Sequence, residues 1–144
     1  MTDLSGRIIL VTGASRGIGY ATALALATGG AHVIACARTQ GGLEDLDDAI
    51  TAAGGHCTLV PMDLKDFNTI DRLAEIVTER FGRLDGLFGN AAELGDIILL
   101  PHTTPKTWDS VIGTNLTANY RLVRAFDPLL RASDSARVVF VTSS

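Results

Sequence analysis

The glycine spacing near the start of the chain is the first pattern that could do chemistry. The segment TGASRGIG, residues 12–19, joins an apolar run to a stretch of small residues with helical spacing. Glycines permit a tight turn and a close approach of the backbone to a ligand, and a helix N-terminus offers unpaired N–H groups to a phosphate. The segment therefore predicts a pyrophosphate site, although such a turn can also serve only to pack a helix on a strand. The residues expected to bind are Gly13, Ser15, Arg16, Gly17, Ile18 and Gly19.

Polar side chains follow the later apolar runs in the same way. Arg38, Asp63, Asn90 and Ser143 each come directly after a run that is rich in apolar residues. In an open parallel sheet the carboxyl ends of all strands lie at one edge, and ligands bind there at the point where the strand order reverses. We therefore expect these side chains to gather with the glycine segment at one edge of a sheet.

The elements that must position these residues alternate between strand and helix. Short apolar runs rich in β-branched residues alternate with longer segments of helical period, and glycine pairs mark several of the joints. This alternation predicts an α/β fold with a doubly wound (Rossmann) parallel sheet in three α/β/α layers, and a single domain over residues 1–144. The expected strands are 8–12, 32–37, 56–62, 84–89 and 138–142, and the expected helices are 18–28, 43–53, 67–81 and 105–131.

The sequence resembles the classical type of the short-chain dehydrogenase/reductase family over its whole length. TGASRGIG matches the glycine motif of that family, and Asn115 in W-D-S-V-I-G-T-N-L matches its motif in the fourth helix. The resemblance implies hydride transfer between a nicotinamide dinucleotide and a small carbonyl or secondary alcohol substrate. It also implies that Ser143 hydrogen-bonds the substrate oxygen, or Ser144 if the strand register is shifted by one residue.

Asn115 and the adenosine contacts take their expected roles from the same resemblance. Asn115 would hold a water-linked proton relay to a catalytic lysine, whereas an asparagine at this point of a helix could also simply bend it. Asp63 and Leu64 would lie beside the adenine, although Asp63 could instead be a plain turn carboxylate. Asn90 and Ala91 would brace the adenosine in the segment G-N-A-A, where the family usually has N-N-A-G.

The choice between the two dinucleotides depends on the end of the second expected strand. An Asp or Glu there would accept hydrogen bonds from a ribose 2′-hydroxyl and repel a 2′-phosphate. This sequence has Ala-Arg-Thr at residues 37–39 instead, and Arg38 together with Arg16 could form charge-assisted hydrogen bonds to a 2′-phosphate. We therefore predict NADP(H) in preference to NAD(H), the alternative being that both arginines are solvated loop charges.

The resemblance also implies a Tyr-x-x-x-Lys pair downstream of the serine, and this pair is not in the sequence. The tyrosines are Tyr20 and Tyr120, and Tyr120-x-x-x-Arg124 has a cation that cannot relay protons near neutral pH. We therefore expect a truncated form, the N-terminal portion of the family fold, with strand 138–142 as an open apolar edge and at most trace turnover. A dinucleotide-binding module that acts through a partner chain, and a purely structural fragment, are the alternatives.

Composition bounds the partners and the compartment. The net charge is −4, with 12 basic and 16 acidic residues spread along the chain, which argues against nucleic acid and anionic membranes as partners. Cys36 and Cys57 lack ligand spacing, so we expect reduced thiols and no metal site. The chain also lacks a basic leader and a long apolar segment, which predicts a cytoplasmic protein. The helix starting at Pro105 is rich in apolar residues, and the resemblance implies a homodimer or homotetramer through it.

Overall fold

The computed structural model describes residues 2–143 and contains one parallel sheet. The strand order is β3-β2-β1-β4-β5, so the chain winds outward from β1 in one direction and then restarts on its other side. The order therefore reverses between β1 and β4, which confirms the predicted doubly wound fold. The strands are β1 (Ile8–Thr12), β2 (His32–Ala37), β3 (His56–Pro61), β4 (Gly86–Gly89) and β5 (Arg137–Phe140).

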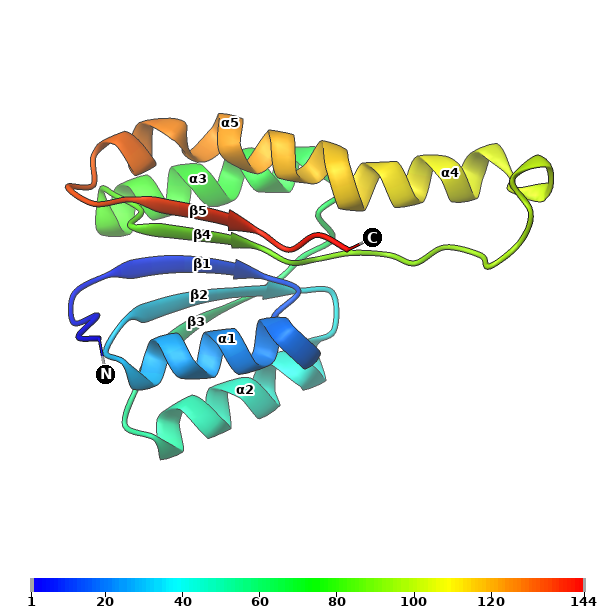
Figure 1. The fold of residues 1–144 in the computed structure, drawn as a ribbon. Helices are drawn as coiled ribbons and strands as arrows, with labels where there is room; N and C mark the ends of the chain where they lie inside the picture. The colour runs from blue at the N-terminus through cyan, green and yellow to red at the C-terminus, as the bar shows by residue number, and fades with distance from the viewer. Residues whose placement is uncertain (1, 144) are drawn as a thin grey trace.

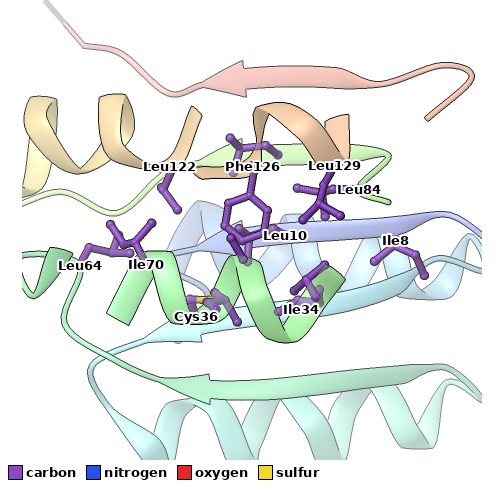
Figure 2. Close-up of a cluster of buried hydrophobic side chains, with 14 of the residues drawn as sticks. Ile8, Leu10, Ile34, Cys36, Leu64, Ile70, Leu84, Leu122, Phe126 and Leu129 are labelled. Carbon is purple, nitrogen blue, oxygen red and sulfur yellow. The ribbon is translucent and has the colours of Figure 1, made fainter. Parts of the chain in front are cut away.

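Helices cover both faces of the sheet, as the expected three layers require. In Figure 1, α1 (Gly17–Thr28) and α2 (Gln40–Ala52) lie on one face, and α3 (Phe67–Phe81) and α5 (Ala118–Arg131) lie on the other. The first face is packed with small side chains such as Ala23 and Ala27 of α1, which let that helix approach the sheet closely. On the second face, Leu122 and Phe126 of α5 meet Leu10 and Ile34 of the sheet in one buried cluster (Figure 2).

The expected single helix over residues 105–131 is interrupted. Thr104 caps α4 (Pro105–Ile112) by accepting a hydrogen bond from the Thr107 N–H at 3.2 Å, as the Thr-Pro pair predicts. A π-helical turn, η2 (Gly113–Thr117), then separates α4 from α5, and it contains Asn115. A π turn widens the backbone by one residue and is found most often where side chains are held for function. The short helix η1 (Leu100–His102) precedes α4, which extends past the end of the sheet (Figure 1).

Several expectations about element ends and faces are wrong. The strands expected at 56–62, 84–89 and 138–142 are shorter than predicted. The strand expected at 84–89 begins only at Gly86, because the Leu84 N–H bonds to the Leu129 carbonyl instead of to a neighbouring strand. The apolar spacing within residues 67–81 predicts that Ile76 faces the sheet, but Ile76 is 46% exposed because its helical position falls outside the buried stripe of Ile70, Leu73 and Val77. The run 138–142 lies at the edge of the sheet, as expected: within residues 2–143 β5 pairs with β4 alone, and its side chains are exposed.

The edge of the sheet at which the strands begin is held together by one buried carboxylate. Asp85, whose side chain is 2% exposed, accepts hydrogen bonds from the Ile8 N–H at 2.8 Å and from Ser133 Oγ at 2.6 Å. Arg83 and Arg7 pair with the same carboxylate at 3.1 and 3.4 Å. Burial alone would raise the pKa of Asp85, but the hydrogen bonds from Ser133 and Ile8 and the charge of Arg83 hold it below its usual value. This carboxylate therefore ties the entry of β1 to the entry of β4.

Replacing Asp85 tests this arrangement. Asp85→Asn should lower the free energy of unfolding by about 2–4 kcal/mol, since it removes the anion from a buried set of donors. A depressed pKa means that the wild-type advantage is complete above the ordinary aspartate pKa of about 4 and is lost as the pH falls through the lower folded-state value. Urea unfolding at several pH values measures both effects. Asp134→Asn, which removes an exposed partner of Arg7, should cost less than about 1 kcal/mol; equal costs for the two variants would contradict the account.

Candidate functional site

A cavity of about 620 Å³ lies at the carboxyl edge of the sheet. It is surrounded by the segments that follow β1, β2, β3 and β4, which are the segments that contain the predicted polar residues. The structure brings these predicted residues together as lining residues: Gly13, Ser15, Arg16, Gly17, Arg38, Asp63, Leu64, Asn90 and Ala91. Further lining residues that were not predicted from the sequence are Cys36, Ala37, Thr39, Gly42, Met62, Ala92 and Thr114.

The turn between β1 and α1 depends on two glycines. Gly13 has φ of +62°, in the left-handed region that a residue with a Cβ adopts only under strain. A Cβ on Gly19 would collide with the Gly13 carbonyl oxygen and come within 2.6 Å of Asn90 Nδ2. Gly19 is buried beneath the turn and Ile18 is 59% exposed. Neither of these two predicted residues lines the cavity. Gly19 thus shapes the turn from below rather than facing a ligand.

Asn90 and Thr12 hold the turn from the side of β4. Asn90 Nδ2 donates to the Gly13 carbonyl at 3.2 Å and to the Thr12 carbonyl at 3.3 Å. The Thr12 hydroxyl is fully buried and accepts hydrogen bonds from the N–H groups of Asn90 at 2.9 Å and Ala91 at 3.1 Å. Thr12 was not among the predicted site residues, although a single hydroxyl at the end of an otherwise apolar strand is a signal that could have found it. The two strand ends on either side of the switch point are therefore locked together.

The first turn of α1 faces the cavity with its backbone. Arg16 occupies the N-cap position of α1, and its side chain makes no capping hydrogen bond among the described residues. The first turn of the helix contains no acidic residue. The first N–H groups of a helix have no intrahelical partner, and the helix dipole favours negative charge at this end. With Gly17 on the cavity wall, this end of α1 offers donors to a phosphate group.

The other end of the cavity contains one anion and one cation from neighbouring strands. Asp63 follows β3 and accepts the Lys65 N–H at 2.9 Å, so it has the turn role while it also lines the cavity. Arg38 follows β2, and its side chain is 62% exposed. Cys36 lies in the wall as well, and burial raises its pKa to about 12, which keeps the thiol protonated. Both cysteines are free, as expected.

Glu93, which the sequence analysis did not single out, organises the loop after β4. Its carboxylate accepts hydrogen bonds from Ser110 Oγ at 2.6 Å and Thr114 Oγ1 at 3.1 Å, and it pairs with Lys65 Nζ at 3.0 Å. The Ser110 hydrogen bond is the main cause that lowers the pKa of Glu93, and Lys65 and Thr114 add to it against the effect of partial burial. No regular spacing joins residues 65, 93, 110 and 114, so this cluster is visible only in the folded chain.

Both polar atoms of the Asn115 side-chain amide hydrogen-bond to the backbone of Glu93. Its Oδ1 accepts the Glu93 N–H at 2.7 Å, and its Nδ2 donates to the Glu93 carbonyl at 2.9 Å. Its own carbonyl accepts from Asn119 Nδ2 at 3.1 Å. Asn115 does not line the cavity, and its position in the π turn fits the alternative that it perturbs the helix. The observed contacts thus show Asn115 fixing the loop after β4.

Ser143, the predicted contact of the substrate oxygen, lies outside the cavity lining. Ser143 follows β5 on the same edge of the sheet, but it is exposed and does not line the cavity; Ser144 lies outside the described residues.

Gly89 replaces the first asparagine of the usual family motif, and a Cβ at this position would collide with the Phe140 ring. The departure from N-N-A-G therefore has a packing reason in this chain.

Residues 2–143 contain neither a membrane-spanning helix nor a cluster of metal-binding side chains. Within this part of the chain no helix is long and apolar enough to cross a membrane. The same residues contain no group of three or more His, Cys, Asp or Glu side chains that could hold a metal ion.

Comparisons with known proteins agree with this geometry. The sequence profile described as short chain dehydrogenase matches residues 7–144. A 3-oxoacyl-[acyl-carrier-protein] reductase of Synechocystis is 35% identical over 99% of this chain and 58% of that protein. An uncharacterized NAD-dependent oxidoreductase of Mycobacterium tuberculosis is 36% identical over 99% of this chain and 56% of that protein. A metagenomic short-chain oxidoreductase solved in complex with NADP superposes with a TM-score of 0.95 at 37% identity, over 99% of this chain and 65% of that one.

The chain belongs to the short chain dehydrogenase family, as the glycine motif and Asn115 indicated. Its fold is that of these oxidoreductases, and its relatives act as oxidoreductases by name. The chain spans somewhat more than half the length of the curated relatives it matches.

Substitution of Gly19 tests the architecture of the turn. Gly19→Ala should lower the free energy of unfolding by about 1–3 kcal/mol, because the new methyl group meets backbone atoms that cannot move aside. Gly41→Ala in the first turn of α2 is the matched control, since a Cβ there meets nothing within 4 Å. That control should be neutral or stabilising by up to about 1 kcal/mol. Chemical unfolding of both variants decides the point, and a tolerated Gly19→Ala would show that the turn is not tightly packed.

Proposed function

We propose that this chain binds NADP(H) and contributes the cofactor half of an oxidoreductase that interconverts a small carbonyl compound and a secondary alcohol. The observation that carries the proposal is the single cavity that joins the glycine turn, the start of α1 and Arg38 at the switch point of the sheet. Ligands of α/β proteins bind at this place, and a volume of about 620 Å³ falls in the range of small-molecule sites.

The residues present fit a dinucleotide. A Cβ on Gly17 would meet nothing within 4 Å, so the space beside this cavity-lining residue is open and a pyrophosphate could approach the backbone at the helix start. Asp63 and Leu64 would hold the adenine, and Asn90 with Ala91 would brace the adenosine. When bound, the nicotinamide supplies the hydride, while the protein supplies binding and orientation.

The preference for a 2′-phosphate is supported by the residues at the end of β2. Both Arg16 and Arg38 line the cavity, and β2 ends in Ala37 without the acidic residue that would accept from a ribose 2′-hydroxyl. One similar protein is NAD-dependent by name and another was solved with NADP, so membership of the family does not decide the cofactor. The proposal therefore rests on the guanidinium groups, which suit phosphate geometry.

For the substrate side, we assign Ser143 to the substrate oxygen, with Ser144 as the alternative, and Asn115 to the proton relay. Ser143 follows the strand next to β4, at the edge where the cavity lies. Asn115 is fixed by both hydrogen bonds of its amide, which supports a positioning role. The tyrosine and lysine that the family uses for proton transfer have no counterpart in the printed sequence.

We further propose that the protein forms a homodimer or homotetramer through α4 and α5 and acts in the cytoplasm. Trp108, Leu116 and Tyr120 are more than half exposed on these helices and the turn between them, which leaves apolar surface for a subunit contact. Two free cysteines and no disulfide among the described residues suit a reducing compartment.

Replacing Arg38 tests the cofactor assignment. In the wild-type chain NADPH should bind more tightly than NADH, and Arg38→Ala should weaken NADPH about 10- to 100-fold while NADH is nearly unchanged, because a charge-assisted hydrogen bond to the 2′-phosphate is lost. Fluorescence titration of both nucleotides measures this. Arg131→Ala, which removes an exposed arginine near the end of α5, is the control and should leave both affinities unchanged. Equal wild-type affinities, or an undiminished NADPH affinity in Arg38→Ala, would refute the preference.

A further inference from the structure

An ion pair connects two walls of the cavity. Arg38 leaves the sheet after β2, and Glu93 lies in the loop after β4, so the two residues start on opposite sides of β1. Arg38 Nη1 nevertheless reaches Glu93 Oε1 at 3.6 Å. Glu93 itself does not line the cavity, but Ala92 before it and Thr114, which donates to its carboxylate, both do. The guanidinium is thus drawn toward the wall formed by β4 and the π turn.

The two partners of this pair are held very differently. The Glu93 carboxylate is only 17% exposed and is fixed by Ser110, Thr114 and Lys65, while its backbone is held by Asn115. Arg38 is 62% exposed and has no other ion pair among residues 2–143. If Arg38 turns away, Glu93 keeps Lys65 as its counter-ion at 3.0 Å, so the release leaves no uncompensated anion. Arg38 is therefore the partner that can be given up.

From this geometry we infer that Glu93 is a positioning residue for Arg38 and sets how strongly the cavity prefers a phosphorylated over a plain ribose. The inference rests on the proposed function, because it takes Arg38 as the partner of the 2′-phosphate. A 2′-phosphate and the Glu93 carboxylate compete for one guanidinium. Glu93 therefore limits the preference for the phosphorylated nucleotide instead of increasing it.

The test compares two nucleotides that differ only in the 2′-phosphate. Adenosine 2′,5′-bisphosphate and adenosine 5′-monophosphate are titrated into the wild-type chain and Glu93→Gln by calorimetry. The amide keeps the shape of the side chain and removes its charge, so Arg38 is released. Glu93→Gln should bind the bisphosphate about 2- to 5-fold more tightly and the monophosphate with unchanged affinity, which is the range expected for an exposed ion pair.

Two further variants separate positioning from a general effect of charge or stability. In an Arg38→Ala background, Glu93→Gln should no longer change the ratio of the two affinities, because the residue acts through Arg38. Glu79 lies in the last turn of α3, at the end of the molecule away from the cavity. Glu79→Gln removes the same charge as Glu93→Gln and should leave the ratio of the two affinities at its wild-type value.

The outcomes distinguish this inference from the proposed function. A wild-type chain that binds neither nucleotide refutes both. A wild-type chain that prefers the bisphosphate, with a ratio that Glu93→Gln leaves unchanged or lowers, refutes only the role of Glu93. A gain that persists in the Arg38→Ala background, or an equal change for both nucleotides, also rules out positioning through Arg38.

Discussion

The interlocked ends of β1 and β4 are the constraint on which the rest of the site depends. Asn90 closes the glycine turn through the carbonyls of Thr12 and Gly13, and the buried Thr12 hydroxyl in turn holds the backbone of Asn90 and Ala91. Gly19 leaves no room between these groups for even one methyl. Because the strand order reverses at this junction, the start of α1 and the loop after β4 must face the same cavity.

A second network extends this junction toward the π turn. Asn115 holds the backbone of Glu93, and the carboxylate of Glu93 collects Ser110, Thr114 and Lys65. The first part of the loop after β4, residues 90–93, is thereby held by Thr12 and by Asn115. Arg38 pairs with the Glu93 side chain and Asn115 bonds to the Glu93 backbone, so the residue proposed to bind the ribose phosphate and the residue expected in the proton relay are linked through Glu93.

Much of this architecture could be predicted from the sequence because it depends on local patterns. Apolar runs rich in β-branched residues identified the strands, and the rule that parallel strands end at one edge placed Arg38, Asp63 and Asn90 near the glycine turn. The Thr104-Pro105 pair likewise located the start of α4. The resemblance supplied the family, which the comparisons confirm.

What could not be predicted depends on contacts between distant residues. The π turn at residues 113–117 interrupts a pattern that looks continuously helical, and the Glu93 cluster joins residues without a shared period. Ser143, although it follows the strand next to β4, does not line the cavity, because adjacency in the sheet does not fix where an exposed end points.

Under the proposed function, a dinucleotide lies across this cavity with its pyrophosphate at the glycine turn and its 2′-phosphate at Arg38. Amide NMR spectra recorded during a titration with NADPH test it most directly, since each backbone N–H reports its own surroundings. The largest shifts are expected at Gly13, Gly17, Arg38 and Asn90, and NADH should reproduce them except near Arg38. Shifts that concentrate away from the carboxyl edge of the sheet, or no shifts at saturating NADPH, would contradict it.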